Sequence, residues 1–277
     1  MSRVSCGSCG KIITGMFQIG AAMLLIHCGG NGETPATDAG TETAPVARIS
    51  STLPTSENYS VVAVADGGVI TGTITYGGVA PEPKPLVINN DLAVCGADGH
   101  MDESFLVGAD NGIQNVIISL TDITSGKPMD ALGSEFVLDQ LGCVYTPHIV
   151  LVPAGIPLNV KNSDGILHNV HTYSTENPSK NLAQPKFKKE MDVLFERAER
   201  IPVRCDVHPW MVGYIQVVDH PYHVITDDAG RFTIDDVPPG TYTVEIWQEK
   251  LGRAMLSVTV SAGETTELNH EYPASNR

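Results

Sequence analysis

Three side chains that bind metals stand within the seven-residue stretch Cys205-Asp-Val-His208-Pro-Trp-Met211. A thiolate, an imidazole and a thioether together suit copper, because calcium and magnesium prefer oxygen ligands. A trigonal copper site needs a second imidazole, and His168 stands upstream in the string Ile-Leu-His-Asn-Val-His. Two histidines, one cysteine and a weak axial methionine form the ligand set of type I (blue) copper sites. The sequence therefore predicts one copper ion with these four ligands.

The segments that would position these ligands have the pattern of β-strands. Residues 68–76 alternate between apolar and polar side chains, and two glycines end the run. Residues 114–120, 135–138 and 148–152 are compact apolar runs of the buried-strand type. Short runs rich in valine, isoleucine and threonine, separated by glycine and proline, are typical of all-β proteins. We therefore expect a Greek-key β-sandwich over residues 61–218.

The secondary structure of the residues between the two ligand segments is harder to predict. Asn181–Glu199 is the one stretch with helical composition, although it could also be a strand that leads toward Cys205. Its mixed charges are typical of a solvated surface, so we assign it no chemistry. Strand alternation places His171 on the face opposite His168, and we expect it not to be a ligand.

A second unit is expected over residues 219–277. Val224–Trp247 contains two alternating strands, and the turn sequences Asp-Ala-Gly and Pro-Pro-Gly punctuate them as in hairpins. This pattern predicts a small β unit with hairpins, and we expect it to pack against the first sandwich.

Two groups in the second unit could bind metal, but each has a simpler interpretation. His220 and His223 could form a surface site, or they could line the contact between the two sandwiches, which we expect. A set of four aspartates could suggest calcium, but they lack an ordered ligand loop, so we expect turn residues instead. These aspartates are Asp227, Asp228, Asp235 and Asp236.

The ligand segments resemble the cupredoxin superfamily, and within it the amicyanin-like, methylamine-utilisation branch. The resemblance lies in Leu167-His-Asn-Val-His171, in the spacing of the Cys205–Met211 loop, and in the strand that begins at Tyr145. It implies a cupredoxin-like fold, with His168, Cys205, His208 and Met211 as copper ligands and Asn169 tying the two ligand loops together. The chain departs from the family in a long charged insertion, residues 172–200, and in lacking an aromatic residue just before the cysteine.

This resemblance implies an electron carrier. The ring edge of His208, beside Trp210, would be the electron port. The sequence shows no nucleophile paired with a base and no open coordination position, so we do not expect an enzyme. The alternatives are a copper chaperone or storage protein, and a surface adhesion or carbohydrate-binding protein. The second alternative would depend on residues 219–277, which resemble carboxypeptidase-regulatory-like (transthyretin-like) modules.

The N-terminus has the pattern of an export signal over residues 1–28. Basic residues precede the apolar run 12–26, which is too short for a comfortable membrane span. Cys28 follows this run and precedes small residues, which resembles a bacterial lipoprotein processing site. Residues 29–60 lack apolar periodicity and are expected to form a flexible tether. The expected location is the periplasm or outer cell envelope.

The remaining cysteines allow two interpretations. If Cys28 carries a lipid and Cys205 binds metal, Cys95 and Cys143 remain, and a disulfide between them fits an oxidising compartment. Alternatively, Cys143 and the nearby His148 could belong to a second metal site.

The net charge restricts the partners. A formal charge of −15 argues against nucleic-acid binding, which requires a basic surface. It favours a basic redox partner, such as a c-type cytochrome, through electrostatic steering. Contact with a membrane is expected only through a lipid anchor or the signal segment.

Overall fold

The structure is a computed structural model, and it describes residues 58–96 and 99–274. The expected export signal, Cys28 and nearly all of the expected tether lie outside these residues. The described residues all belong to one compact unit, Pro45–Arg277. Among them, no helix has the length and apolar character needed to cross a membrane.

The described chain is mostly β-structure, which confirms the predicted all-β class. Helical structure is restricted to α1, Leu92–Cys95, and three short 3₁₀ turns. These turns are Glu103–Phe105, Ala109–Asn111 and Met129–Leu132. Two short strands, β1 (Ser60–Val61) and β4 (Ser125–Gly126), pair in parallel away from the larger sheets.

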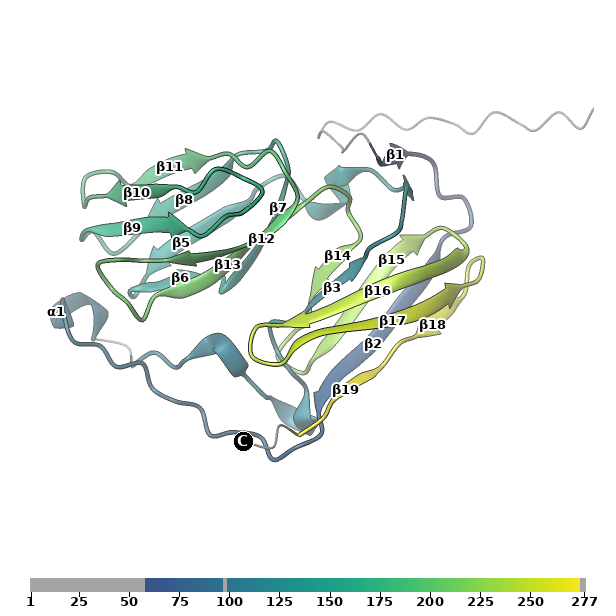
Figure 1. Ribbon diagram of the computed structural model, residues 1–277, viewed down its shortest axis with the longest axis horizontal. Helices are drawn as coiled ribbons and strands as arrows, with labels where there is room; N and C mark the ends of the chain where they lie inside the picture. The colour runs from purple at the N-terminus through teal and green to yellow at the C-terminus, as the bar shows by residue number, and fades with distance from the viewer. Residues whose placement is uncertain (1–57, 97–98, 275–277) are drawn as a thin grey trace, which may run out of the picture. The chain divides into compact units, whose positions relative to one another are not determined.

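The first sandwich carries both predicted ligand segments and is drawn mainly in green in Figure 1. Its five-stranded sheet has the order β10-β9-β12-β13-β7, and its four-stranded sheet has the order β11-β8-β5-β6. The strands are β5 (Val137–Leu141), β6 (Val144–Thr146), β7 (Ile149–Pro153), β8 (Leu158–Asn162), β9 (His168–Thr172), β10 (Asn181–Gln184), β11 (Glu190–Val193), β12 (Glu199–Arg204) and β13 (Val212–Val218).

The second sandwich is built from strands at both ends of the described chain. One sheet has the order β14-β3-β16-β17, and the other has the order β15-β2-β18, with β19 also paired to β2. The strands are β2 (Gly68–Tyr76), β3 (Ile117–Leu120), β14 (His223–Ile225), β15 (Arg231–Val237), β16 (Gly240–Gln248), β17 (Gly252–Val260), β18 (Thr265–Glu267) and β19 (His270–Tyr272).

The two sandwiches are therefore not consecutive segments, which differs from the predicted boundaries 61–218 and 219–277. β2 pairs with β15, and β3 pairs with β14 and β16, so both early strands complete the second sandwich. The apolar side chains Ile70 and Ile118 lie in the core of that sandwich. The physical reason is that the backbone hydrogen bonds of a strand can be made with a strand far away in sequence. An apolar run predicts a buried strand but does not specify the strand with which it pairs.

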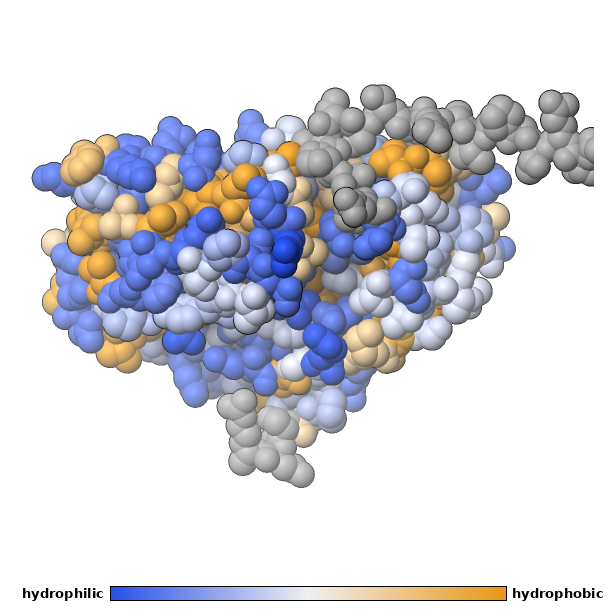
Figure 2. Space-filling model, turned by 45° about the horizontal axis from the view of Figure 1, so that its top comes forward, coloured by the Kyte–Doolittle hydropathy of each residue, from blue (hydrophilic) through white to orange (hydrophobic). Residues whose placement is uncertain are grey.

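Alternation explains how each sandwich closes over its own core. In β8, side chains at positions 158, 160 and 162 are buried while those between them are half exposed. In β15, Phe232 and Ile234 point inward between exposed neighbours. Full burial of such apolar side chains contributes about 1.5–3 kcal/mol each. Figure 2 shows the complementary outer surface, where polar side chains predominate and apolar ones form separate patches.

The segment of helical composition, residues 181–199, forms strands. It contains β10 and β11 and ends at the first residue of β12. In both short strands only the last residue, Gln184 or Val193, is buried. The charged residues of β11, Glu190 and Asp192, are exposed on either side of Met191. Tertiary pairing with β9 and β8 overrides the helical composition.

Candidate metal centre

The predicted ligand loop connects β12 to β13. Cys205 follows the last residue of β12, and its backbone N–H donates to the carbonyl of Met211 (3.2 Å). Within the loop, the N–H of Met211 donates to the carbonyl of His208 (2.9 Å). Strand β9 pairs with β12 so that Arg204 lies opposite His171, which brings the beginning of β9 beside the loop. Strand pairing thus places His168 next to a loop that is distant in sequence.

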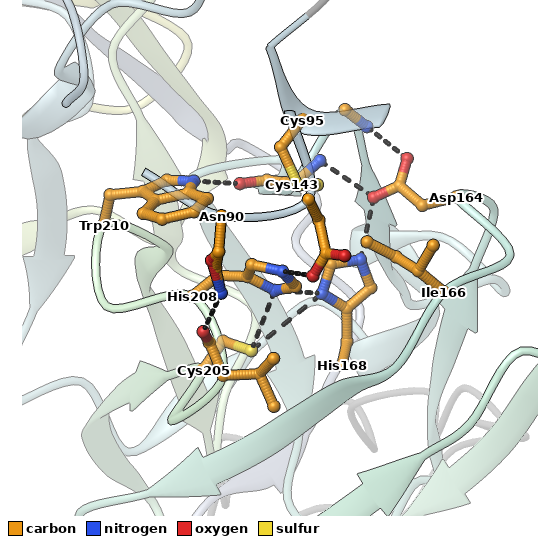
Figure 3. Close-up of a disulfide and its surroundings, with 12 residues drawn as sticks. Asn90, Cys95, Cys143, Asp164, Ile166, His168, Cys205, His208 and Trp210 are labelled. Atoms are coloured by element: carbon orange, nitrogen blue, oxygen red, sulfur yellow. Dashed lines mark hydrogen bonds and ion pairs between the residues drawn. A yellow bond between two sulfur atoms is a disulfide. The ribbon is translucent and has the colours of Figure 1, made fainter. Parts of the chain in front are cut away.

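Three predicted ligand atoms converge at this place. Nδ1 of His168 and Nδ1 of His208 are 3.0 Å apart, and Sγ of Cys205 lies 3.9 Å and 3.7 Å from them. All three side chains are at least 99% buried. Figure 3 shows the two rings and the sulfur facing one another. An ion with bonds of about 2.0 Å to nitrogen and 2.3 Å to sulfur needs separations of roughly 3.3–3.8 Å. The separation of Cys205 and His208 lies within this range, and the other two lie just outside it.

Met211 closes the same loop and is fully buried in the core of the first sandwich. Its backbone contacts with Cys205 and His208 fix its position at the end of the loop. A buried thioether at the end of this loop fits the weak axial position of a type I copper site.

The thiol of Cys205 is held in a form suited to a metal. Burial raises its pKa, but the contact of its sulfur with the ring of His168 and hydrogen bonds from the backbone amides of Asn169, His208 and Val207 outweigh burial, so the pKa is lowered from its usual value. Metals bind the thiolate, and amide donors around the sulfur stabilise it.

Asp164 sets the orientation of the first histidine ligand. Its Oδ2 accepts a hydrogen bond from Nε2 of His168 (2.9 Å), because a carboxylate can only accept. The same carboxylate accepts the backbone N–H groups of Gly142 (2.5 Å) and Cys143 (2.8 Å). Burial raises the pKa of Asp164, yet these donors outweigh it and lower the pKa. The proton of a neutral His168 ring is thus held on Nε2, and Nδ1 keeps its lone pair for a metal.

The outer nitrogen of the second histidine also faces a carboxylate. Nε2 of His208 donates to Oδ2 of Asp91 at 3.0 Å. Burial lowers the pKa of His208, although the hydrogen bond to Asp91 acts in the opposite direction. Burial also lowers the pKa of His168, but Asp164 and Cys205 outweigh it and raise that pKa.

These contacts make a cation at the centre of the triangle favourable. With both ring protons on Nε2, two nitrogen lone pairs and a thiolate face one another in a buried space. Such a cluster is stable only with a proton or a metal ion among the three atoms. The residues present therefore fit a soft or borderline metal ion, and binding would release any proton held there.

Asn169 connects the two ligand segments. Its Oδ1 accepts the backbone N–H of Asp206 (2.6 Å), and its Nδ2 donates to Asn181 (2.6 Å) and to Asp206 (3.2 Å). The neighbouring His171 points to the other face, where its Nδ1 contacts the Asp206 carboxylate at 2.9 Å. His171 thus supports the loop from outside the triangle of ligand atoms.

The predicted disulfide between Cys95 and Cys143 is confirmed. It lies close to the ligand cluster, since Nε1 of Trp210 donates to the carbonyl of Cys143 (3.0 Å). His148 instead contacts Glu249 through Nε2 (2.5 Å). The alternative of a second metal site at Cys143 and His148 is therefore wrong. The sulfur of Cys143 is bonded to Cys95, and Nε2 of His148 faces the carboxylate of Glu249.

His220 and His223 form, with Asp219, a separate group whose ligand atoms lie close enough together to hold a metal ion. His220 and His223 are buried and stack with ring centroids 4.3 Å apart. Nδ1 of His220 accepts the backbone N–H of Tyr222 (3.2 Å), and Nδ1 of His223 pairs with Ser119 (2.7 Å).

Two of the four aspartates have partners that the structure shows plainly, one within a turn and one far away in sequence. Oδ1 of Asp227 accepts the N–H groups of Ala229 (2.9 Å) and Arg231 (2.8 Å), which closes a turn. Asp235 pairs with Lys127. The contacts of Asp227 agree with the expectation of a turn residue, whereas Asp235 and Asp236 lie within β15, so that expectation is wrong for these two.

The surface at the expected electron port differs from an open imidazole edge. The ring of His208 is fully buried, and Asp91 lies at its outer nitrogen. Pro209 is exposed, and Trp210 is half-buried with its ring centroid 5.1 Å from that of His208. Sequence reasoning missed Asp91, since it stands 117 positions before its partner and no motif surrounds it.

Comparisons with known proteins describe parts of this chain. Residues 206–268 match the family described as polysaccharide lyase family 4, domain II, a fibronectin-III-like module. The expected resemblance in this region was to a different β-sandwich family, and the β-sandwich architecture is what both share. The search of curated proteins found none that matches this chain.

Solved structures of copper proteins match about a third of the chain. An oxidised mutant of amicyanin is 21% identical and covers 32% of this chain and 89% of its own, with a TM-score of 0.28. A purple cupredoxin from Nitrosopumilus maritimus is 18% identical and covers 30% of this chain and 100% of its own, with a TM-score of 0.25. The copper-containing nitrite reductase of Thermus scotoductus is 18% identical and covers 31% of this chain, with a TM-score of 0.28.

This chain spans only 23% of the length of that reductase. The assignment of ligands rests on the geometry of the site, since the matches concern the fold of part of the chain. About a third of the chain is thus similar to amicyanin, and residues 206–268 are similar to the polysaccharide lyase family 4, domain II model.

Proposed function

We propose that this protein is an exported electron carrier with one type I copper ion bound by His168, Cys205, His208 and Met211. The observation that carries the proposal is the convergence of two Nδ1 atoms and one thiolate sulfur within 3.9 Å of one another in a buried space. This donor set, with an axial thioether, is the one that type I copper proteins use.

The surrounding residues support a site that changes little during electron transfer. Copper bound here would supply the one-electron couple between Cu(I) and Cu(II). Asp164 and Asp91 hold the two rings in place, and Asn169 fixes the loop that carries the thiolate. Ligands that are held before the ion binds need little rearrangement between the two oxidation states, which favours rapid transfer.

Burial of the ligands favours a carrier over an enzyme or a copper-delivery protein. The side chains of all four proposed ligands are at least 99% buried. A substrate would need an open coordination position, and a recipient protein would need a ligand that it can reach. Electrons can cross a thin layer of protein without such access.

The proposed partner is a basic redox protein, for which a c-type cytochrome is the model. The formal charge of −15 supports this choice because it would accelerate encounters with a positively charged surface. The proposed location is the periplasm or outer envelope, with a lipid anchor at Cys28. The disulfide between Cys95 and Cys143 supports an oxidising compartment.

Copper loading tests the proposal. We expect the protein to bind one copper ion and to turn blue on oxidation, because charge transfer from the Cys205 thiolate absorbs visible light. The variant Cys205→Ser should lose the colour, whereas His171→Gln, which changes a histidine outside the triangle of ligand atoms, should keep it. A wild-type protein that stays colourless after copper loading would contradict the proposal.

A further inference from the structure

The ring of His208 is covered on its outer side by a segment that belongs to neither sandwich. Residues 86–95 lie between the described strands β2 and β3, and they include α1. Asp91, at the N-terminal end of α1, reaches Nε2 of His208 at 3.0 Å. We call residues 86–95 the cover segment.

Several contacts hold the cover segment at this position. Nδ2 of Asn90 donates to the carbonyl of Val207 (2.9 Å), inside the ligand loop itself. Cys95 is bonded to Cys143. Apolar side chains at positions 88 and 94 pack against the core of the first sandwich. Asp91 thus lies in the chain between Asn90, which hydrogen-bonds to the ligand loop, and Cys95, which forms the disulfide.

The backbone of Asp91 shows that this position is determined by its surroundings. Its φ of 48° and ψ of 37° lie in the left-handed region, which residues other than glycine rarely adopt. Its carbonyl accepts the N–H groups of Val94 and Cys95, both at 2.9 Å. The turn formed this way directs the side chain of Asp91 to the imidazole.

The chemistry of this contact bears on how His208 can bind a metal. A neutral imidazole carries one proton, and a carboxylate can only accept it, so the proton is held on Nε2. Nδ1 then presents its lone pair toward Sγ of Cys205 (3.7 Å) and Nδ1 of His168 (3.0 Å). Outer carboxylates of this kind fix the tautomer and orientation of a histidine ligand and increase its basicity.

We propose that Asp91 is a positioning residue for the copper ligand His208: it fixes the tautomer that directs Nδ1 inward, and its negative charge favours Cu(II) over Cu(I). This inference rests on the proposed function, since it assigns a role in the same copper site. The side chain of Asp91 is 47% exposed, so water screens part of its charge. The effect of the charge should therefore be smaller than that of a fully buried carboxylate.

The first arm of the test uses the metal-free full chain and does not depend on copper. We expect ¹⁵N NMR of the imidazole groups to show His208 protonated on Nε2 in the wild type. In Asp91→Ala the acceptor is lost, and the two tautomers should become mixed. An unchanged tautomer in Asp91→Ala would overturn the positioning role, whether or not the protein binds copper.

The second arm measures the reduction potential of the copper-loaded protein. Asp91→Asn removes the charge and keeps the size of the side chain, so the potential should shift upward. The control is Asp192→Asn, which removes an equal charge from an exposed position of β11, where the aspartate accepts a hydrogen bond from the Asn159 side chain (3.1 Å).

Equal potentials in the two aspartate variants would overturn the role of the charge. Failure of the wild type to bind copper would refute the proposed function, and the NMR arm would still decide the role of Asp91.

Discussion

Oδ1 of Asn169 lies 2.6 Å from the backbone nitrogen of Asp206, and this hydrogen bond joins the strand that carries one histidine to the loop that carries the cysteine. Asn169 is 6% exposed, so the bond is shielded from water. The two ligand segments are 37 positions apart in sequence and are fixed to each other without a metal ion.

Replacement of Asn169 by alanine should destabilise the metal-free protein by about 1–3 kcal/mol, because the N–H of Asp206 would lose its buried partner. Denaturant unfolding of the metal-free protein measures this change. Asn159→Ala is the matched control, since its Nδ2 contacts only exposed carboxylates on the neighbouring strand. An equal loss of stability in both variants would show that the contact between the loops has no special role.

Substitutions of Met211 should shift the reduction potential while copper stays bound. Leucine removes the weak axial donor and should raise the potential, whereas glutamine offers a harder oxygen that favours Cu(II) and should lower it. Met191→Leu, which changes a methionine packed against the same core, should leave the potential unchanged. An unchanged potential in both Met211 variants would mean that this residue is not a ligand.

Glu199 should make the stability of the protein depend on pH in the acid range. Burial raises its pKa, but hydrogen bonds from Thr175 and Asn177 outweigh burial and lower the pKa from 4.5 to about 2. Because the folded pKa is lower than the unfolded one, the stabilisation is present above pH 4.5 and is lost as the pH falls toward 2. Unfolding free energies measured across this range should fall more steeply for the wild type than for Glu199→Gln.

The exposed Glu135 supplies the control for this measurement. Glu135→Gln should keep the wild-type pH dependence. A Glu199→Gln protein whose stability falls in parallel with that of the wild type would contradict the prediction.

Association with a basic cytochrome should depend on charge and on Trp210 in separable ways. Electrostatic steering is screened over about 8 Å at physiological salt, so the association rate should fall as salt is added. Trp210→Ala should weaken the docked complex and leave the slope of rate against salt nearly unchanged. Stopped-flow reduction over a salt series measures both effects.

Because Trp210 contacts residues at the proposed copper site, its replacement could also change the site itself, and this effect needs a control. Its Nε1 donates to the carbonyl of Cys143, and its ring lies beside His208. The visible spectrum of Trp210→Ala should therefore be compared with that of Trp210→Phe, which keeps an apolar ring. A rate that responds neither to salt nor to Trp210 would show that electrons enter elsewhere.

The convergence of His168, Cys205 and His208 could be predicted from the sequence because these residue types stand in a recognisable pattern. The spacing of Cys205, His208 and Met211 places three proposed ligands on one loop, and a remote histidine with its asparagine neighbour completes the pattern. The disulfide was one of the two interpretations that the number of cysteines allowed. Each of these inferences depends on residue types that have few other uses in such a pattern.

The sequence could not reveal relationships that depend on tertiary pairing. The apolar runs of β2 and β3 indicate buried strands but do not say which strands they join, so their place in the second sandwich was missed. Asp91 was missed for a related reason, since a lone aspartate in a polar loop carries no sign of the imidazole that it contacts.

The placement of the first sandwich within the chain has a consequence for cooperativity. Its strands lie between Leu120 and Tyr222, and the N–H of Leu120 donates to the carbonyl of Tyr222 at 3.1 Å. The polypeptide thus leaves the second sandwich and returns to it at adjacent points, so the first sandwich is connected to the second at both of its ends. Unfolding of the first sandwich would allow Leu120 and Tyr222 to separate, which would destabilise the second sandwich. Unfolding of the second sandwich would free both ends of the first. The two modules should therefore unfold as coupled partners.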